Sequence, residues 1–261
     1  ALNANLAHVL QSNDARFVDS VARRSFRNFG KYVIDVVHFP STTREEIIRR
    51  LHFDQWEQLD EAANSGRGVI IATIHFGNWD FGAAALAARG YPISAIAETF
   101  PYHRMDNLMQ GSRRKLGMRV IGHDRMGPTV FKALRRGEIL AMLVDVSSEE
   151  AGIRVDFFGA PALVSPAPAR IALRTNAWVV PAVVLRGPDD DTVIRPIIDT
   201  GLRDFTPTGD TQRDVHELTR QVMASLEKVI RAYPEQWFIF RRMWNQTADA
   251  RASAARLAGE V

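Results

Sequence analysis

The stretch 68-GVIIATIHFGNWDFGAAALAARG-90 decides the fold class of this chain. Its first seven residues are apolar except for Thr73 and rich in β-branched side chains, which predicts a short buried strand. The alanine-rich segment at its end predicts a helix that stops at Gly90, because glycine is favoured just past a helix C-terminus. A polar turn, "HFGNWD", lies between the two elements. A strand, a turn and a helix in this order are the repeating unit of an α/β fold.

The same alternation continues along the chain. Further strands are predicted at "YPISAIA", "MRVIG" and "ILAMLVDVS", and the segments between them, "MDNLMQGSRRKLG" and "GPTVFKALRRGE", are predicted helices. "AWVVPAVVLRG" and "DTVIRPII" predict two more strands, antiparallel across the acidic "PDDD" turn. Continuous apolar strands that alternate with helices indicate a mostly parallel central sheet flanked by helices.

The chain length of 261 residues is typical of one α/β domain. Residues 1–62 show apolar side chains at helical spacing with arginines between them, which predicts a helical N-terminal segment. Residues 63–245 form the predicted α/β core, and the arginine- and alanine-rich residues 246–261 a frayed tail. The sequence starts at Ala1 rather than at a methionine, so a preceding membrane anchor stays an open alternative.

Composition excludes several kinds of chemistry. The absence of cysteine excludes thiol catalysis, disulfides and cysteine-based zinc sites. Neither a Gly-x-Gly-x-x-Gly nor a Walker loop is present, and the histidines lack metal-ligand spacing. We therefore expect no metal and no cofactor.

Basic residues are mostly arginines in small clusters, and the isoelectric point is about 9.5. Such dispersed positive charge suits anionic membranes or phosphorylated substrates. No RNP motif, zinc finger or basic zipper is present, so we expect no nucleic-acid partner.

His75 and Asp80 lie where a parallel sheet carries its ligands, beyond the carboxyl end of a strand. With His75 in the turn and Asp80 in the first helical turn, the carboxylate can fold back to one imidazole nitrogen. The other nitrogen can then take a proton from a substrate hydroxyl. No serine or cysteine lies in this turn, so the nucleophile would belong to the substrate, as in acyl transfer to an alcohol. Asn78 and the backbone amides of the turn could donate to an oxyanion.

A second polar segment, "DVSSEEAG", follows the predicted fourth strand. If this strand neighbours the first, Glu149 or Glu150 could approach His75. An ordinary capped turn, with no catalytic role for His75 and Asp80, is the alternative interpretation.

Six sequence blocks resemble the bacterial lipid A biosynthesis acyltransferase family. This family includes the late lauroyl and myristoyl acyltransferases and the mycobacterial phosphatidylinositol mannoside acyltransferases. "HFGNWD" is similar to its His-x4-Asp/Glu block. The other blocks follow in the family's order over about residues 2 to 245: "NLAHVL" before it, and after it "SRRKLGMRVI", "GIRVDFFGAPA", "ARIALRTNAWVVPAVVLR" and "EQWFIFRRMW".

The resemblance implies a glycerolipid-acyltransferase-like fold and a peripheral enzyme on the cytoplasmic face of the inner membrane. Such an enzyme moves a long-chain acyl group from acyl-CoA or acyl carrier protein to a hydroxyl of a glycolipid, either a phosphatidylinositol mannoside or a lipid A-like acceptor. His75 matches the general base, Asp80 its orienting acid, and Arg113, four residues before Gly117, a group that approaches the thioester or an anionic headgroup.

The acidic loop before "FFG" matches the region that supplies another active-site carboxylate, from Glu150 or Glu149. Arg154 in the same loop could contact phosphate. One alternative is a glycerolipid acyltransferase that uses the related Asn-His-x4-Asp motif. Ile74 argues against it, because that motif has asparagine at this position. Another is a non-catalytic lipid-binding protein on the same fold. The acceptor, the acyl chain length, the donor and the oligomeric state are left open.

Overall fold

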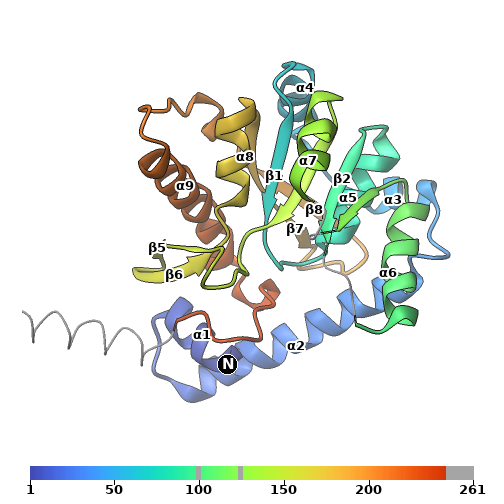
Figure 1. The fold of residues 1–261 in the computed structure, drawn as a ribbon. Coiled ribbons are helices and arrows are strands. Elements are labelled where there is room, and N and C mark those ends of the chain that lie inside the picture. The colour runs from blue at the N-terminus through green and yellow to red at the C-terminus, as the bar shows by residue number, and fades with distance from the viewer. Residues whose placement is uncertain (98–100, 123–125, 245–261) are drawn as a thin grey trace, which may run out of the picture.

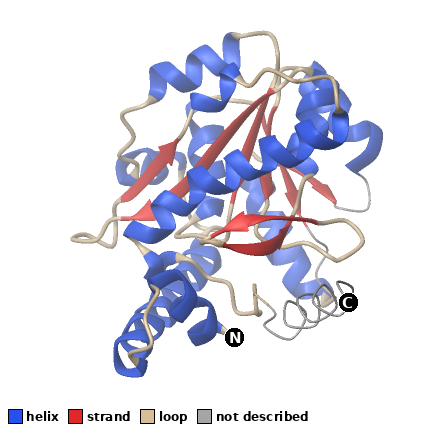
Figure 2. Ribbon diagram, turned by 90° about the vertical axis from the view of Figure 1, so that its left-hand side faces the viewer, coloured by secondary structure: helices blue, strands red, loops and turns tan. Residues whose placement is uncertain are grey.

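The computed structural model describes residues 1–97, 101–122 and 126–244, which form a six-stranded sheet with helices on both faces (Figures 1 and 2). The segment 246–261, expected to be a frayed tail, lies outside the described residues. The strands are β1 (Val69–Thr73), β2 (Ile93–Ala97), β3 (Arg119–Gly122), β4 (Ile139–Leu143), β5 (Ile153–Phe157), β6 (Ala160–Val164), β7 (Trp178–Arg186) and β8 (Ile194–Ile198).

The helices are α1 (Leu2–Leu10), α2 (Ala15–His38), α3 (Arg44–Arg50), α4 (Trp56–Asn64), α5 (Trp79–Arg89), α6 (His103–Lys115), α7 (Met126–Arg135), α8 (Ala167–Thr175) and α9 (Thr211–Ala232). Two short 3₁₀ helices, η2 (Gly201–Asp204) and η3 (Pro234–Gln236), flank α9. The helical N-terminal segment is therefore confirmed. Among the described residues, no helix combines the length and the apolar character that crossing a bilayer requires.

The sheet has the order β3-β2-β4-β1-β7-β8 and is mostly parallel. Strand β1 lies in the middle, paired in parallel with β4 on one side and β7 on the other, and the edge strand β8 runs antiparallel to β7. All five residues of β1 are buried, as expected for a strand covered on both faces. The α/β class and the antiparallel pair across the acidic turn are thus confirmed.

One element was not predicted: β5 and β6 form a separate antiparallel hairpin. Its two-residue loop, Phe158 and Gly159, has positive φ at both positions, as a type I′ turn requires. Such turns usually carry Asn-Gly or Asp-Gly, so the usual sequence signal is missing here. Along β5 the buried residues Val155 and Phe157 alternate with the exposed Arg154 and Asp156, a strand pattern that is present in the sequence.

The C-terminal segment returns to the turn after β1. Residues Phe76 and Trp237 form an antiparallel bridge. Around it, the amide of Phe238 donates to the carbonyl of His75 at 2.7 Å, and the amide of Gly77 donates to the carbonyl of Gln236 at 2.8 Å. Helix α2 covers this segment from outside, so the N- and C-terminal parts of the chain together enclose the turn (Figure 1).

Gly77 lets this turn press against β7. Its φ is +57°, in the left-handed region that favours glycine. A Cβ at this position would lie 1.9 Å from the carbonyl oxygen of Val184. The amide of Asn78 donates to that same oxygen at 2.9 Å, so the backbone has no room to move away.

Replacing Gly77 by alanine should therefore destabilise the fold by at least about 3 kcal/mol, measured by urea unfolding. Gly90→Ala is the matched control, because Gly90 also has positive φ but a Cβ there meets no described atom within 4 Å. The control should lose only about 1–2 kcal/mol, the cost of the left-handed backbone. Equal losses in the two variants would show that the contact with Val184 imposes no constraint.

Candidate active site

The centre of the site is a buried carboxylate that holds His75. Strands β1 and β4 are neighbours, with Thr73 opposite Leu143, so the segments that follow them emerge at the same edge of the sheet. Asp145, whose side chain is 0% exposed, places Oδ1 at 2.8 Å from Nδ1 of His75. Its Oδ2 accepts from the amide of His75 at 2.9 Å and from the indole Nε1 of Trp237 at 3.0 Å.

These contacts define the protonation pattern of the imidazole. An ionised carboxylate only accepts hydrogen bonds, so Nδ1 of His75 carries the proton that Asp145 accepts. Nε2 is then the nitrogen that can take a proton from a hydroxyl, and Asp145 stabilises the imidazolium that results. This arrangement can perform general base chemistry.

Asp80 makes a different contact from the one predicted for it. Its carboxylate, buried near the start of α5, accepts two parallel hydrogen bonds from Arg113 of α6: from Nε at 2.7 Å and from a terminal nitrogen at 3.0 Å. The hydroxyl of Tyr32 also donates to it, at 2.8 Å. The bond to one imidazole nitrogen of His75 that was expected from Asp80 is made by Asp145 instead, at Nδ1. The physical reason is that Arg113 brings an opposite charge to Asp80 in a low-dielectric environment.

Asp80 is connected to His75 through aromatic rings. The ring of Tyr32 stacks on Trp79, with centroids 4.1 Å apart, and Trp79 in turn meets the ring of His75 edge-on at 5.2 Å. Burial, and then the neighbouring Asp80 carboxylate, raise the pKa of Tyr32 well above its ordinary value. The phenol therefore stays protonated and keeps its bond to Asp80.

The donors expected from the turn are already engaged. The side chain of Asn78 caps α5 by accepting from the amide of Phe81 at 3.0 Å, and it donates to Asp35 at 2.7 Å. The amides of Gly77 and Asn78 donate to backbone carbonyls of the C-terminal segment and of β7. In this structure Asn78 and these two amides hold the turn in place, and their donation to an oxyanion stays a prediction.

The acidic loop after β4 lies at the surface. Glu149 and Arg154, both exposed, pair with each other at 3.0 Å. Glu150 is exposed too, and hydrogen bonds from its own backbone and from Ser148 lower the pKa of its carboxyl. The expected adjacency of the two strands is confirmed, but Asp145, the first residue of the loop, is the carboxylate that it brings to His75.

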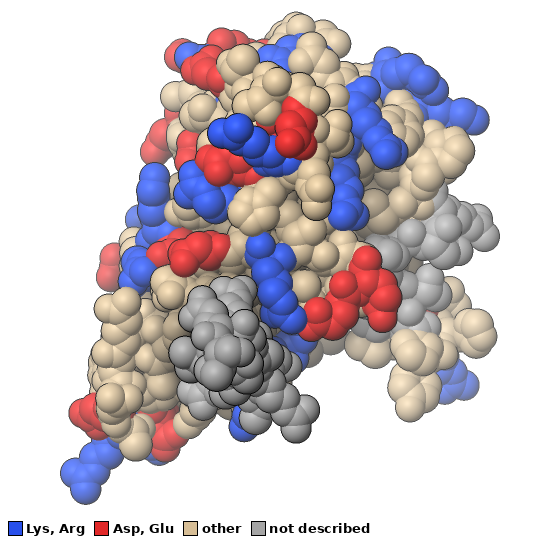
Figure 3. Space-filling view, turned by 60° about the vertical axis from the view of Figure 1, so that its left-hand side comes forward, with Lys and Arg blue, Asp and Glu red and all other residues tan. Residues whose placement is uncertain are grey.

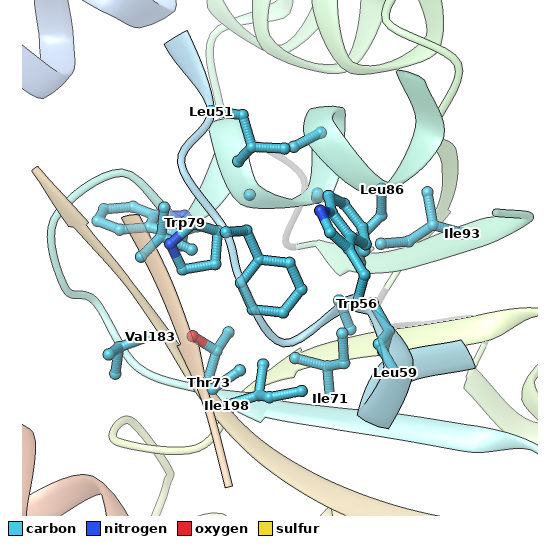
Figure 4. Close-up of a pocket in the computed structure, with 18 residues that line it drawn as sticks. Leu51, Trp56, Leu59, Ile71, Thr73, Trp79, Leu86, Ile93, Val183 and Ile198 are labelled. Atoms are coloured by element: carbon cyan, nitrogen blue, oxygen red, sulfur yellow. The ribbon is translucent and has the colours of Figure 1, made fainter. Parts of the chain in front are cut away.

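An apolar pocket borders this site, between the sheet and helices α4 and α5 (Figure 4). It encloses about 570 Å³ of empty space, part of which is continuous with solvent. Trp79 lines the pocket and also contacts the ring of His75, whereas His75 itself is not among the lining residues. Its lining comes from α4, α5, β1, β7, β8 and the segment before α4, and includes Leu51, Phe53, Trp56, Leu59, Ile71 and Ile198.

Sequence reasoning missed three residues of this site: Asp145, Tyr32 and Trp237. Asp145 had a readable signal, since it is the first polar residue after an apolar strand. Tyr32 and Trp237 had none, because they lie more than forty residues from the groups they contact. Within the part of the chain that the structure describes, no three His, Cys, Asp or Glu side chains gather as a metal site would require.

Comparison with known proteins assigns the chain to a family. A model of the family described as bacterial lipid A biosynthesis acyltransferase matches residues 1–246. The chain is 26% identical over 250 residues to the phosphatidylinositol mannoside acyltransferase of Mycobacterium tuberculosis, covering 93% of this chain and 76% of that protein. It is 24% identical over 247 residues to the enzyme of the same name from Mycolicibacterium smegmatis, covering 93% of this chain and 78% of the relative. The chain therefore belongs to the bacterial lipid A biosynthesis acyltransferase family and is an acyltransferase.

Proposed function

We propose that this acyltransferase moves a long-chain acyl group from a thioester directly to a hydroxyl of a glycolipid, with His75 as the general base. The observation that carries this proposal is the buried Asp145 carboxylate, which fixes the imidazole beside an apolar pocket. The pocket suits an acyl chain because its walls are apolar and include Trp79, which contacts the His75 ring.

The reaction needs one base and no covalent enzyme intermediate. Nε2 of His75 takes the proton of the acceptor hydroxyl while its oxygen bonds to the thioester carbonyl carbon. The carbonyl π electrons move to the carbonyl oxygen, which becomes an oxyanion. When the intermediate collapses, the carbon–sulfur bond breaks and the thiolate takes the proton back from His75. The donor thiol is that of coenzyme A or acyl carrier protein, and no metal or cofactor takes part.

The names of the relatives favour a phosphatidylinositol mannoside as the acceptor, and the family description adds lipid A-like glycolipids. Both are anionic and polyhydroxylated. Arg113 is not among the residues that line the apolar pocket, and it is held by Asp80 and by Gln110 at 3.1 Å. In the proposed complex it attracts the anionic acceptor, and Arg154 at the surface adds positive charge for its phosphate.

The enzyme would work at a membrane, on the cytoplasmic face of the inner membrane. Helix α2 exposes apolar side chains at positions 26, 33, 34 and 37, a spacing that places them on one face. Tyr102, Met105 and Leu108, at the start of α6, are exposed as well. The two helices are linked, because Tyr32 of α2 and Arg113 of α6 bond the same carboxylate.

Arginines accompany this apolar surface. Arg23, Arg24 and Arg27 are exposed on α2. Figure 3 shows basic side chains spread over one side of the molecule, with acidic side chains and uncharged surface between them. An amphipathic helix of this kind lies in the interface of an anionic bilayer, with its apolar side chains among the acyl chains. Since α2 runs beneath the ends of the parallel strands, this orientation turns the site toward the lipid (Figure 1).

His75→Ala should reduce acyl transfer to about 1% of the wild-type rate or less, since a positioned base contributes about 10²–10⁴-fold. The assay measures labelled palmitate transferred from palmitoyl-CoA to phosphatidylinositol mannoside and, in parallel, to a lipid A precursor. His216→Ala, an exposed histidine on α9, is the control and should keep full activity. A folded His75→Ala protein that keeps more than about a tenth of the rate would contradict the mechanism.

Asp145→Asn should lower transfer about 10²–10⁴-fold with little change in the fold. The N–H groups of His75 and Trp237 fix the amide oxygen at the position of Oδ2. The amide nitrogen then faces Nδ1 and donates to it, so the imidazole proton moves to Nε2, which can no longer act as a base. Asp156→Asn, at an exposed position of β5, is the control. A loss below tenfold would show that Asp145 does not set the tautomer.

The double substitution Ile34→Glu and Val37→Glu should weaken binding to vesicles that contain anionic lipid at least tenfold, measured by flotation. Both side chains are exposed, at 58% and 57%. Each substitution removes apolar surface that would be buried in the membrane on docking. Ile48→Glu on α3, where the side chain is 49% exposed, is the control and should bind as the wild type does. Undiminished vesicle binding by the double variant would place the docking surface elsewhere.

A further inference from the structure

Thr73 is a polar residue in the wall of the otherwise apolar pocket. It is the last residue of β1 and only 8% exposed. Its hydroxyl oxygen is fully buried and has no hydrogen-bond partner among the described residues. Leaving a buried hydroxyl without a partner costs free energy, so an apolar side chain of the same shape would suit this wall better. Figure 4 shows Thr73 among the lining residues, below Trp79 in that view.

The strand places this hydroxyl toward His75. Side chains alternate along β1: Ile70, Ala72 and Ile74 face the main core, whereas Ile71 and Thr73 line the pocket. His75 follows Thr73 by two residues, about 6–7 Å along a strand. The ring of His75 meets Trp79, which lines the pocket together with Thr73. Alternation puts the side chains of Thr73 and His75 on the same face of the chain, so we take the Thr73 wall as the end of the pocket on the imidazole side.

The reaction needs a donor at that end. Negative charge develops on the carbonyl oxygen of the acyl group when the acceptor attacks, and a positioned donor stabilises it. The amides of Gly77 and Asn78 are bonded to backbone carbonyls, and the Asn78 side chain donates to Asp35. For an acyl chain seated in the pocket, the Thr73 hydroxyl is a donor of the lining that no described protein atom engages.

We propose that the Thr73 hydroxyl donates a hydrogen bond to the acyl carbonyl oxygen and stabilises the oxyanion of the tetrahedral intermediate. This role rests on the proposed function. As the new carbon–oxygen bond forms, the carbonyl electron pair moves onto the oxygen that Thr73 contacts. The pair returns when the carbon–sulfur bond breaks. Thr73 keeps its own proton throughout, and the hydroxyl donates that proton in a hydrogen bond to the substrate oxygen.

The test is Thr73→Val, which has nearly the same shape without the hydroxyl, with Thr73→Ser as the control that keeps it. Thr73→Val should lower kcat for palmitoyl transfer about 10²-fold or more, the effect of losing one oxyanion donor, with KM for palmitoyl-CoA changed less than threefold. Thr73→Ser should keep kcat within about tenfold of the wild type. Because the hydroxyl has no partner in the protein, Thr73→Val should unfold at the same temperature as the wild type or above it.

Several results would overturn this role. A kcat within threefold of the wild type in Thr73→Val would exclude an oxyanion contact. A rise in KM with kcat unchanged would mean that the hydroxyl only binds the donor chain, and a lower unfolding temperature would mean that it supports the fold. Failure of the proposed function would be seen in the wild type itself, which would transfer no palmitate to either glycolipid and would hydrolyse no palmitoyl-CoA. That result would exclude the proposed role of Thr73 as well.

Discussion

The buried carboxylate of Asp145 is the interaction on which the site depends. Moving an ionised carboxylate out of water costs several kcal/mol even after relaxation. Here three N–H groups offset that cost: the amide and the imidazole of His75, and the indole of Trp237. They come from the end of β1 and from the C-terminal segment, while Asp145 follows β4. The charge is thus satisfied only when three distant parts of the chain have come together, so the geometry of the imidazole is a consequence of the completed fold.

Two further buried ion networks hold the turn that follows β1, one on each side of it. Asp35 of α2 accepts from the side chain of Asn78 and pairs with Arg186 of β7, and Arg50 approaches it at 3.3 Å. Asp80 is held in the same way between α2 and α6. Breaking such a pair leaves a buried charge without compensation, which costs about 3–5 kcal/mol. Helix α2 therefore has two functions in the molecule: its buried face fixes the turn through Tyr32 and Asp35, and its exposed face is the apolar surface proposed to meet the membrane.

The secondary structure around His75 could be predicted from the sequence, but the residues that contact the site side chains could not. The apolar run before His75, the capped helix after it and the alternation of elements follow from propensity and periodicity within a dozen residues. Which aspartate bonds to His75, Asp80 or Asp145, depends on which strands are neighbours and on where the side chain of Arg113 lies. Both depend on contacts between distant segments. Glu150 and Glu149 were both left as candidates for the further carboxylate, because they lie side by side in the acidic loop before "FFG". Burial selected the single aspartate directly at the strand end instead, because only there do the surrounding N–H groups converge.

Solvation also determines from which side each substrate would approach. Trp79 separates two environments: one side of it lines the apolar pocket, and the other side stacks on Tyr32, next to the pair of Asp80 and Arg113. An acyl chain gains free energy in the pocket, whereas a sugar headgroup there would lose hydrogen bonds to water without replacement. On the proposed assignment the glycolipid therefore reaches His75 from the side of α2 and α6. These are the helices whose exposed apolar side chains are proposed to face a bilayer, so the acceptor hydroxyl would meet the imidazole without its lipid tails leaving the membrane.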